Sequence, residues 1–153
     1  MMDKYAATGT DPACTAAPGD TTLIVFNPAA LTRAKLYELI FSQGATPADN
    51  VVEWLVRRLT AVGTEGAGVV PAPLDSDAPV AQLDAGEAYT VEPTYTAATE
   101  LLDFDLNQRA TFRFVAAPGG EFWIPAAANE GIGMTPISGA YTGLTRVTAH
   151  WEE

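Results

Sequence analysis

The feature that most constrains this chain is a two-residue alternation of apolar and polar side chains in its C-terminal half. In QRATFRFVAA, residues 108–117, Phe112 and Phe114 alternate with polar or β-branched residues. The same period recurs in ELLDFDLN, residues 100–107, and in TRVTAHWEE, residues 145–153. Successive side chains of a strand point to opposite faces of its sheet. The pattern therefore predicts strands that are buried on one face.

Glycine and proline divide the chain into short segments. There are 13 Gly and 11 Pro, and β-rich runs such as TTLIVFN (21–27) and EFWIP (121–125) end at a proline or just before one. Residues 33–41, RAKLYELIF, fit either a strand or a helical stripe. Residues 69–93 are rich in proline and predict a long connection with at most short strands at AGVV and AYTV. Short strands at a spacing of about ten residues predict an all-β sandwich or barrel.

Residues 46–63 allow two interpretations. Thr46, Pro47 and Asp49 resemble a helix start, with a capping side chain, a proline at the first position and an acid at the third. The apolar residues of VVEWLVRRLT (51–60) then fall on one helical face. The β-branched and aromatic content of the same run also fits a strand buried on both faces, with GTEGAG as the following turn. Local rules favour the helix slightly and leave both interpretations open.

The first 20 residues differ in composition from the rest. They are rich in Ala, Thr, Gly and Pro, and Tyr5 is the one large apolar side chain after the opening methionines. Such a segment has little apolar area to offset the entropy of ordering it. We therefore predict a flexible N-terminal arm at 1–20, with Cys14 as a free and exposed thiol, and a single β domain at 21–153.

Charge excludes two classes of partner. The chain has 8 basic and 19 acidic residues and a formal net charge of -11. A nucleic-acid-binding protein needs a basic face to displace counterions from phosphates, and an anionic membrane surface attracts the same kind of face. We expect neither partner. Because no apolar stretch follows the first methionine, we also expect no secretory signal and synthesis in the cytoplasm.

The sequence offers little for catalysis or for metal binding. A zinc or cupin-type site needs several His or Cys ligands, whereas this chain has one of each, Cys14 and His150. None of its three serines lies in a nucleophile elbow. Asp75 and Asp77 fit a solvated turn better than a calcium site. We expect no catalytic residues, no metal and no cofactor.

The remaining candidates are interface residues. Trp and Arg are enriched among the residues that dominate binding energy in protein interfaces, and positive charge is scarce in this chain. The same side chains also serve core packing and ion pairs within a domain, and we leave that alternative open. The candidate interface residues are Tyr5, Trp54, Arg57, Arg58, Arg109, Arg113 and Trp123.

Six short motifs occur in a fixed order. They are Y-E-L at 37–39, T-P-A-D at 46–49, W-x-x-x-R at 54–58, G-T at 63–64, P-L-D at 73–75 and L-N-Q-R-A-T-F-R at 106–113. This series resembles small capsid decoration, or cement, proteins of tailed bacteriophages. The resemblance covers residues 31–153.

The resemblance implies a fold and a role. Such proteins have jelly-roll or related β-sandwich folds, commonly form homotrimers, and sit on the outer capsid surface of the virion, where they clamp neighbouring subunits of the major capsid protein. They carry no catalytic residues. The resemblance also favours the strand interpretation of residues 50–60. The alternatives are another virion β protein, from a tail, spike or head-completion complex, and a carbohydrate-binding β-sandwich with exposed tryptophans.

Overall fold

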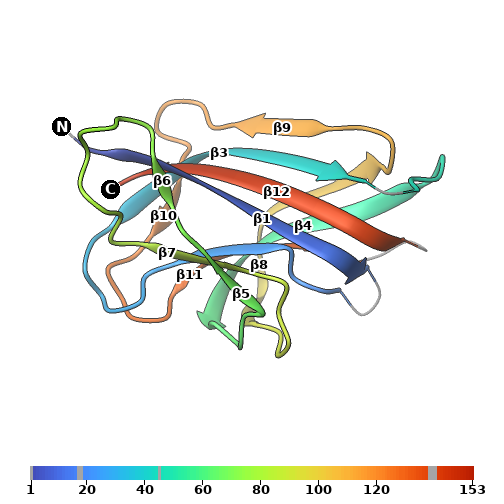
Figure 1. Cartoon of the computed structure of the whole chain (residues 1–153), viewed down its shortest axis with the longest axis horizontal. Helices are drawn as coiled ribbons and strands as arrows, with labels where there is room; N and C mark the ends of the chain where they lie inside the picture. Colours follow the sequence, from blue (N-terminus) through green and yellow to red (C-terminus); the bar gives the residue numbers. More distant parts are fainter. Residues whose placement is uncertain (1, 17–18, 45, 138–140) are drawn as a thin grey trace.

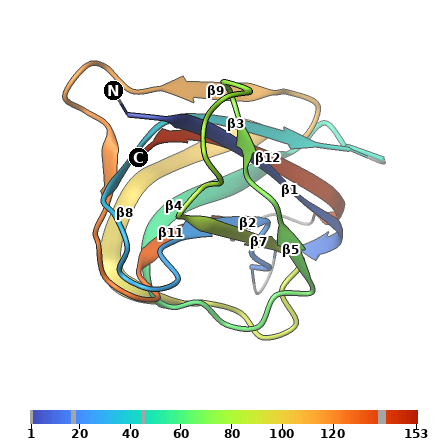
Figure 2. The ribbon, with the colours of Figure 1, turned by 60° about the vertical axis from the view of Figure 1, so that its left-hand side comes forward.

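The computed structural model describes residues 2–16, 19–44, 46–137 and 141–153. The chain forms two six-stranded antiparallel sheets, and in Figure 2 most of sheet A lies above sheet B. Sheet A has the order β10 (Phe122–Ile124), β3 (Ala34–Gln43), β12 (Thr142–Glu152), β1 (Lys4–Thr15) and β6 (Ala72–Pro73), and β9 (Phe112–Val115) also pairs with β3. Sheet B has the order β5 (Ala67–Val69), β7 (Asp84–Glu87), β2 (Leu23–Phe26), β11 (Gly131–Pro136), β4 (Val51–Ala61) and β8 (Thr94–Asn107).

The β-sandwich expectation is confirmed, and the described residues contain no helix. The described part of the chain accordingly has no helix long and apolar enough to span a membrane. The strands predicted from alternation are present as β8, β9 and β12, and the ambiguous residues 33–41 lie in β3. The jelly-roll connectivity implied by the resemblance stays a prediction.

The main core lies between the two sheets. Phe41 of β3 packs edge-on against Trp54 of β4 at 5.2 Å and against Phe104 of β8 at 5.1 Å between ring centroids. Phe104 in turn packs on Phe112 at 4.5 Å. These aromatic pairs join both sheets at one end of the sandwich, and each pair adds about 0.5–1.5 kcal/mol beyond the area it buries.

Residues 51–61 form strand β4, which resolves the two interpretations of this segment. β4 pairs with β11 on one side and with β8 on the other. Val52, Trp54 and Val56 are fully buried in the main core, while Leu59 belongs to a second, smaller core. The apolar residues that mimic a helical stripe are those of a strand buried on both faces, and pairing on both sides overrides local propensity.

The predicted flexible arm at 1–20 is wrong for the described residues. β1 pairs with β12 from Lys4 to Thr15, next to the C-terminal strand (Figure 1). Main-chain bonds of 3.0 Å join Asp3 to Glu153 in both directions. Residues 1 and 17–18 of the predicted arm lie outside the described residues. A composition rich in small residues does not prevent strand pairing, because the ladder is made by the backbone.

Small side chains in β1 allow close packing. A Cβ on Gly9 would lie 2.6 Å from the carbonyl oxygen of Thr22 and 2.8 Å from the Leu23 Cβ. Cys14, predicted to be exposed, is fully buried, and its thiol donates a 3.6 Å hydrogen bond to the carbonyl of Asp20. β1 therefore belongs to the folded domain, which begins before residue 21.

The part of the outer face of sheet B around β2 is covered by the chain itself, whereas β8 of the same sheet stays largely exposed. Ile24, Phe26 and Leu59 form the second core on this face, and Val62 and Tyr89 from the flanking segments and Tyr95 of β8 pack against it. Close approach requires glycine in β11, because a Cβ on Gly133 would lie 2.5 Å from the Tyr95 hydroxyl. β2 is therefore buried on both faces.

Candidate functional site

Two of the sequence motifs meet at one corner of the sandwich. The Ala48 amide of the T-P-A-D turn donates a 2.8 Å hydrogen bond to Gln108 Oε1 of the L-N-Q-R segment. The Gln108 amide donates to the carbonyl of Asn50 at 2.9 Å. Gln108 is 3% exposed, so its side of each bond is sheltered from water, while Ala48 and Asn50 lie at the surface. The turn before β4 is thus fixed by the residues that follow β8.

Two further bonds complete this corner. Asn107 Nδ2 donates to Asp49 Oδ1 at 2.8 Å, and Arg109 Nε donates to the carbonyl of Pro47 at 3.3 Å. Arg109, a candidate interface residue, therefore has a partner within the chain. The motif corner, residues 46–50 with 107–109, is one hydrogen-bonded unit built from segments about 60 residues apart.

Two candidate interface residues lie in the core. Trp54 is 0% exposed and Tyr5 is 1% exposed. The Tyr5 hydroxyl donates to the carbonyl of Pro79 at 3.0 Å, and its ring stacks on Trp151 at 6.1 Å. The prediction that Tyr5 and Trp54 contact a partner is wrong in this fold, because their side chains pack inside the domain.

Arg57 and Arg58 also contact groups within the chain. The Arg57 guanidinium lies 4.1 Å from the centroid of the Tyr95 ring, over the covered face of sheet B. Arg58 Nη1 donates a 2.6 Å hydrogen bond to the carbonyl of Trp123. Arg58 thereby links β4 of sheet B to β10 of sheet A. Both arginine side chains therefore contact other strands of the same domain.

Glu38 is the centre of a charged cluster on the outer face of sheet A. Its carboxylate pairs with Arg113 Nε of β9 and lies 3.1 Å from His150 Nδ1 of β12. The hydrogen bond from Arg113 holds the pKa of Glu38 below its ordinary value, against the opposing effect of burial. The Glu38 carboxylate is therefore charged at neutral pH and joins three strands.

Of the two tryptophans among the candidate interface residues, Trp123 is the one that is not fully buried. The Arg33 guanidinium lies 4.3 Å and the Lys35 ammonium 4.9 Å from a centroid of its ring system. A cation over an aromatic ring at such a distance is attracted by the negative face of the ring. Arg33 and Lys35 were missed as candidates, because their proximity to Trp123 depends on the pairing of β10 with β3.

An acidic cluster lies where β1 ends. Ligand atoms of Asp11, Cys14 and Asp20 lie within 4.8 Å of one another. Burial raises the pKa of Asp11, and it raises the pKa of the Cys14 thiol to about 12. A thiol with that pKa stays protonated at neutral pH and is a poor nucleophile. The two carboxylates of the cluster accept backbone hydrogen bonds: Asp11 accepts one from the Ala13 amide at 3.0 Å, and Asp20 accepts one from the Thr15 amide at 2.7 Å.

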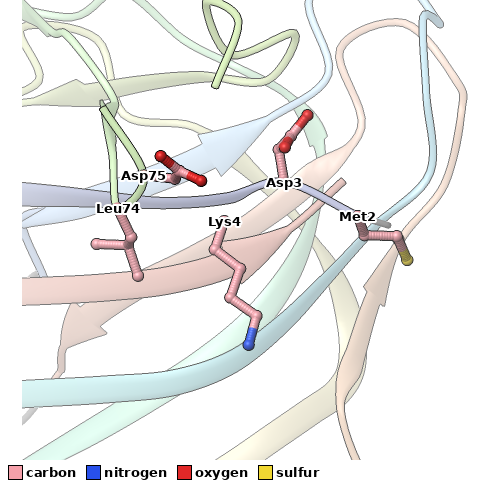
Figure 3. Close-up of a pocket in the computed structure, with 5 residues that line it drawn as sticks. All are labelled: Met2, Asp3, Lys4, Leu74 and Asp75. Atoms are coloured by element: carbon pink, nitrogen blue, oxygen red, sulfur yellow. The ribbon is translucent and has the colours of Figure 1, made fainter. Parts of the chain in front are cut away.

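A pocket lies at the start of β1. It has a volume of about 320 Å³ and is lined by Met2, Asp3, Lys4, Leu74 and Asp75. In Figure 3 the Lys4 side chain extends away from the carboxylates of Asp3 and Asp75. Its ammonium lies 5.6 Å from the centroid of the Tyr37 ring on the outer face of sheet A. The polar groups of this pocket therefore do not converge on one point, as a small-molecule site requires.

Comparison with protein-family models, with curated proteins and with solved structures gives no match for this chain.

Proposed function

We propose that this protein is a structural virion protein that decorates the outer surface of a tailed-phage capsid and stabilises the shell by clamping neighbouring major capsid protein subunits. The motif series carries the proposal. Two of its members, at 46–49 and 106–113, are joined in the motif corner by three hydrogen bonds. Motifs that contact one another in the fold form one structural unit. This contact supports a resemblance in fold between this chain and the decoration proteins.

The physical properties of the domain support the same role. A rigid sandwich that binds in many symmetric copies gains from avidity, because weak contacts add up over the shell. A net charge of -11 disfavours aggregation of the particles that display it. The homotrimer, the jelly-roll connectivity and the position outside the shell are parts of the proposal. It includes no catalytic step and no cofactor.

The burial of β1 changes how such a clamp works. Because residues 4–15 form a strand inside sheet A, this segment is not a mobile arm that reaches a neighbouring subunit. In this proposal the surface of the folded domain makes the contact with the capsid. Attachment needs no ordering of β1 at the moment of binding and avoids that entropy cost.

Copy number in purified particles tests the proposal. The particles are those of the phage that encodes the chain, and quantitative mass spectrometry compares this chain with the major capsid protein. We expect a copy number of the same order as that of the major capsid protein. A few copies per particle favour a tail, spike or head-completion protein instead, and absence from the particle contradicts both.

A further inference from the structure

The outer face of sheet A carries a cross-strand row of charged and aromatic side chains. In the register of the sheet, Lys4 of β1 lies opposite Glu152 of β12, Glu152 lies opposite Lys35 of β3, and Lys35 lies opposite Trp123 of β10. Side chains directly opposite each other on neighbouring strands point to the same face. The Lys35 ammonium and a Glu152 carboxylate oxygen are 3.3 Å apart. The row therefore crosses four strands.

Three further rows follow along the same face. The second row holds His150 and Glu38, and the extra residue Tyr37 at the bulge beside it stacks on His150 at 6.2 Å. The third row ends at Arg113 and the fourth contains Arg146. The remaining members of these rows are Ala6, Val115, Thr8, Thr148, Ile40, Thr10 and Ser42.

This face is positive in a strongly acidic protein. The four rows contain four of the eight bases of the chain, Lys4, Lys35, Arg113 and Arg146, against two acids, Glu38 and Glu152. The rows thus have a formal charge of +2, and the rest of the chain, with four bases and 17 acids, has -13. At the rim, Arg33 lies beside Trp123, while Asp3 and Asp75 line the pocket next to Lys4.

We propose that the outer face of sheet A is the surface that binds the partner protein, and that the partner presents an acidic patch to it. This inference rests on the proposed function and identifies the clamping surface. Complementary potentials steer association and fix the register of an interface. A positive face on a chain whose remaining surface is negative specifies one orientation toward an acidic partner.

Size and composition fit a protein partner. Ten to twelve residues of β1, β12 and β3 and the strands beside them present roughly 600–700 Å², from about 3.3 Å per residue and 4.8 Å between strands. A standard interface buries about 800 Å² on each partner. Trp, Tyr and Arg, the types enriched in interface hot spots, are all present. Cations already lie over the Trp123 ring, which disfavours stacking of a sugar there.

The test compares two variants of equal net charge. R33Q/K35Q removes the two cations around Trp123, and T96E/A97E adds two acids on exposed positions of β8 in sheet B. Both variants change the formal charge from -11 to -13. Circular dichroism and thermal unfolding confirm that both remain folded. Co-sedimentation then measures their binding to capsid shells assembled from the recombinant major capsid protein of the same phage.

We expect R33Q/K35Q to bind the shells about tenfold more weakly or worse, which is about 1.4 kcal/mol, while T96E/A97E binds like the wild type. Equal binding by all three proteins overturns this inference and leaves the proposed function standing. Equal weakening of both variants also overturns it, since the effect is then one of net charge. Wild-type protein that does not bind shells contradicts the proposed function, and this inference with it.

Analytical ultracentrifugation tests the other possible occupant of this face, which is a second copy of this chain. If R33Q/K35Q loses self-association that the wild type and T96E/A97E retain, the face binds another copy, and the proposal of a capsid-facing surface is overturned. Retained self-association with weakened shell binding supports the proposal.

Discussion

The two sheets differ in what lies on their outer faces. On sheet B, around β2, Tyr89 and Tyr95 pack against Ile24, Phe26 and Leu59, while much of β8 stays exposed. Sheet A instead presents aligned rows of polar, charged and aromatic side chains, with Trp123 only partly buried. A face covered by its own chain contributes to stability, whereas an uncovered face of a rigid sheet is available for binding. The self-covered apolar cluster thus lies on sheet B, and the aligned charged and aromatic rows lie on sheet A.

The largest effect is expected from removal of β1, which tests whether the domain folds without this strand. Deletion of residues 1–20 removes the strand that pairs with β12 over Lys4–Thr15, together with the buried Tyr5 and Ala7. We expect no cooperatively folded domain, because sheet A then loses a central strand and part of the main core. Circular dichroism and thermal unfolding measure this, with deletion of residues 1–2 as the control. A truncated protein that unfolds like the wild type contradicts the role of β1.

The next prediction compares the two outer faces directly. The Tyr95 hydroxyl lies 2.7 Å from Thr21 Oγ1 and 3.0 Å from Thr135 Oγ1, and its ring accepts the Arg57 cation. Tyr95→Ala should lower the free energy of unfolding by about 3 kcal/mol, within the range for large aromatic truncations.

Ile40→Ala on the outer face of sheet A is the matched control for Tyr95→Ala. It should cost less, about 1 kcal/mol, because the Ile40 side chain is only partly buried. Urea unfolding gives both values. If the two substitutions cost the same, the outer faces do not differ in the way described.

A smaller effect is expected at the motif corner, where the chain passes from β8 of sheet B to β9 of sheet A. Gln108→Ala removes the buried side-chain acceptor of the Ala48 amide, and loss of such a hydrogen bond costs about 0.5–1.5 kcal/mol. Asn107→Ala removes the exposed bond to Asp49 and should cost about 0.5 kcal/mol or less. Urea unfolding of the two variants should preserve this order, and the reverse order would show that Gln108 does not hold the turn.

The smallest effects concern the pH dependence of stability, to which Glu38 and Glu92 contribute with opposite signs. The pKa of Glu38 is lowered by its bond to Arg113, so its contribution to stability is present above about pH 4.3, the ordinary value for a glutamate, and is lost as pH falls through the lowered pKa. The pKa of Glu92 is raised by burial. Glu92 therefore destabilises the fold at neutral pH, and this penalty disappears as pH falls through the raised pKa.

Two glutamine variants test these signs. At pH 7, Glu38→Gln should lower Tm by roughly 2–4 °C, and Glu92→Gln should raise it by less, because solvent screens the charge of the exposed Glu92 side chain. Both differences should shrink on acidification toward pH 4. Thermal unfolding at pH 4, 5.5 and 7 measures them, and shifts of the same sign at pH 7 would contradict the assignment.

The sequence predicted the elements that have strong side-chain patterns. Phe112, Phe114 and the alternating residues of β8 and β12 have the burial expected from their period. β1 was missed because Ala, Thr and Gly carry no apolar signal, although their backbones pair as well as any others. β11 was not predicted, since its glycines mimic a turn, whereas Gly133 allows close packing under Tyr95 and Gly131 allows close packing against Val25 and Phe26.

The candidate site was predicted only in part. Trp123 and Arg113 lie on the outer face of sheet A, whereas Tyr5 and Trp54 lie in the core. Lys4 and Lys35 gain their importance from a row that joins strands from both ends of the chain. That row depends on register, and a register between strands far apart in sequence cannot be deduced from composition or period alone.

A density map of the intact particle tests the central claim most directly. We expect symmetric copies of the sandwich on the outside of the shell, with the outer face of sheet A, and Arg33, Lys35 and Trp123 in particular, against an acidic patch of the major capsid protein. A shell without this density, or copies that turn this face to solvent, would contradict the account.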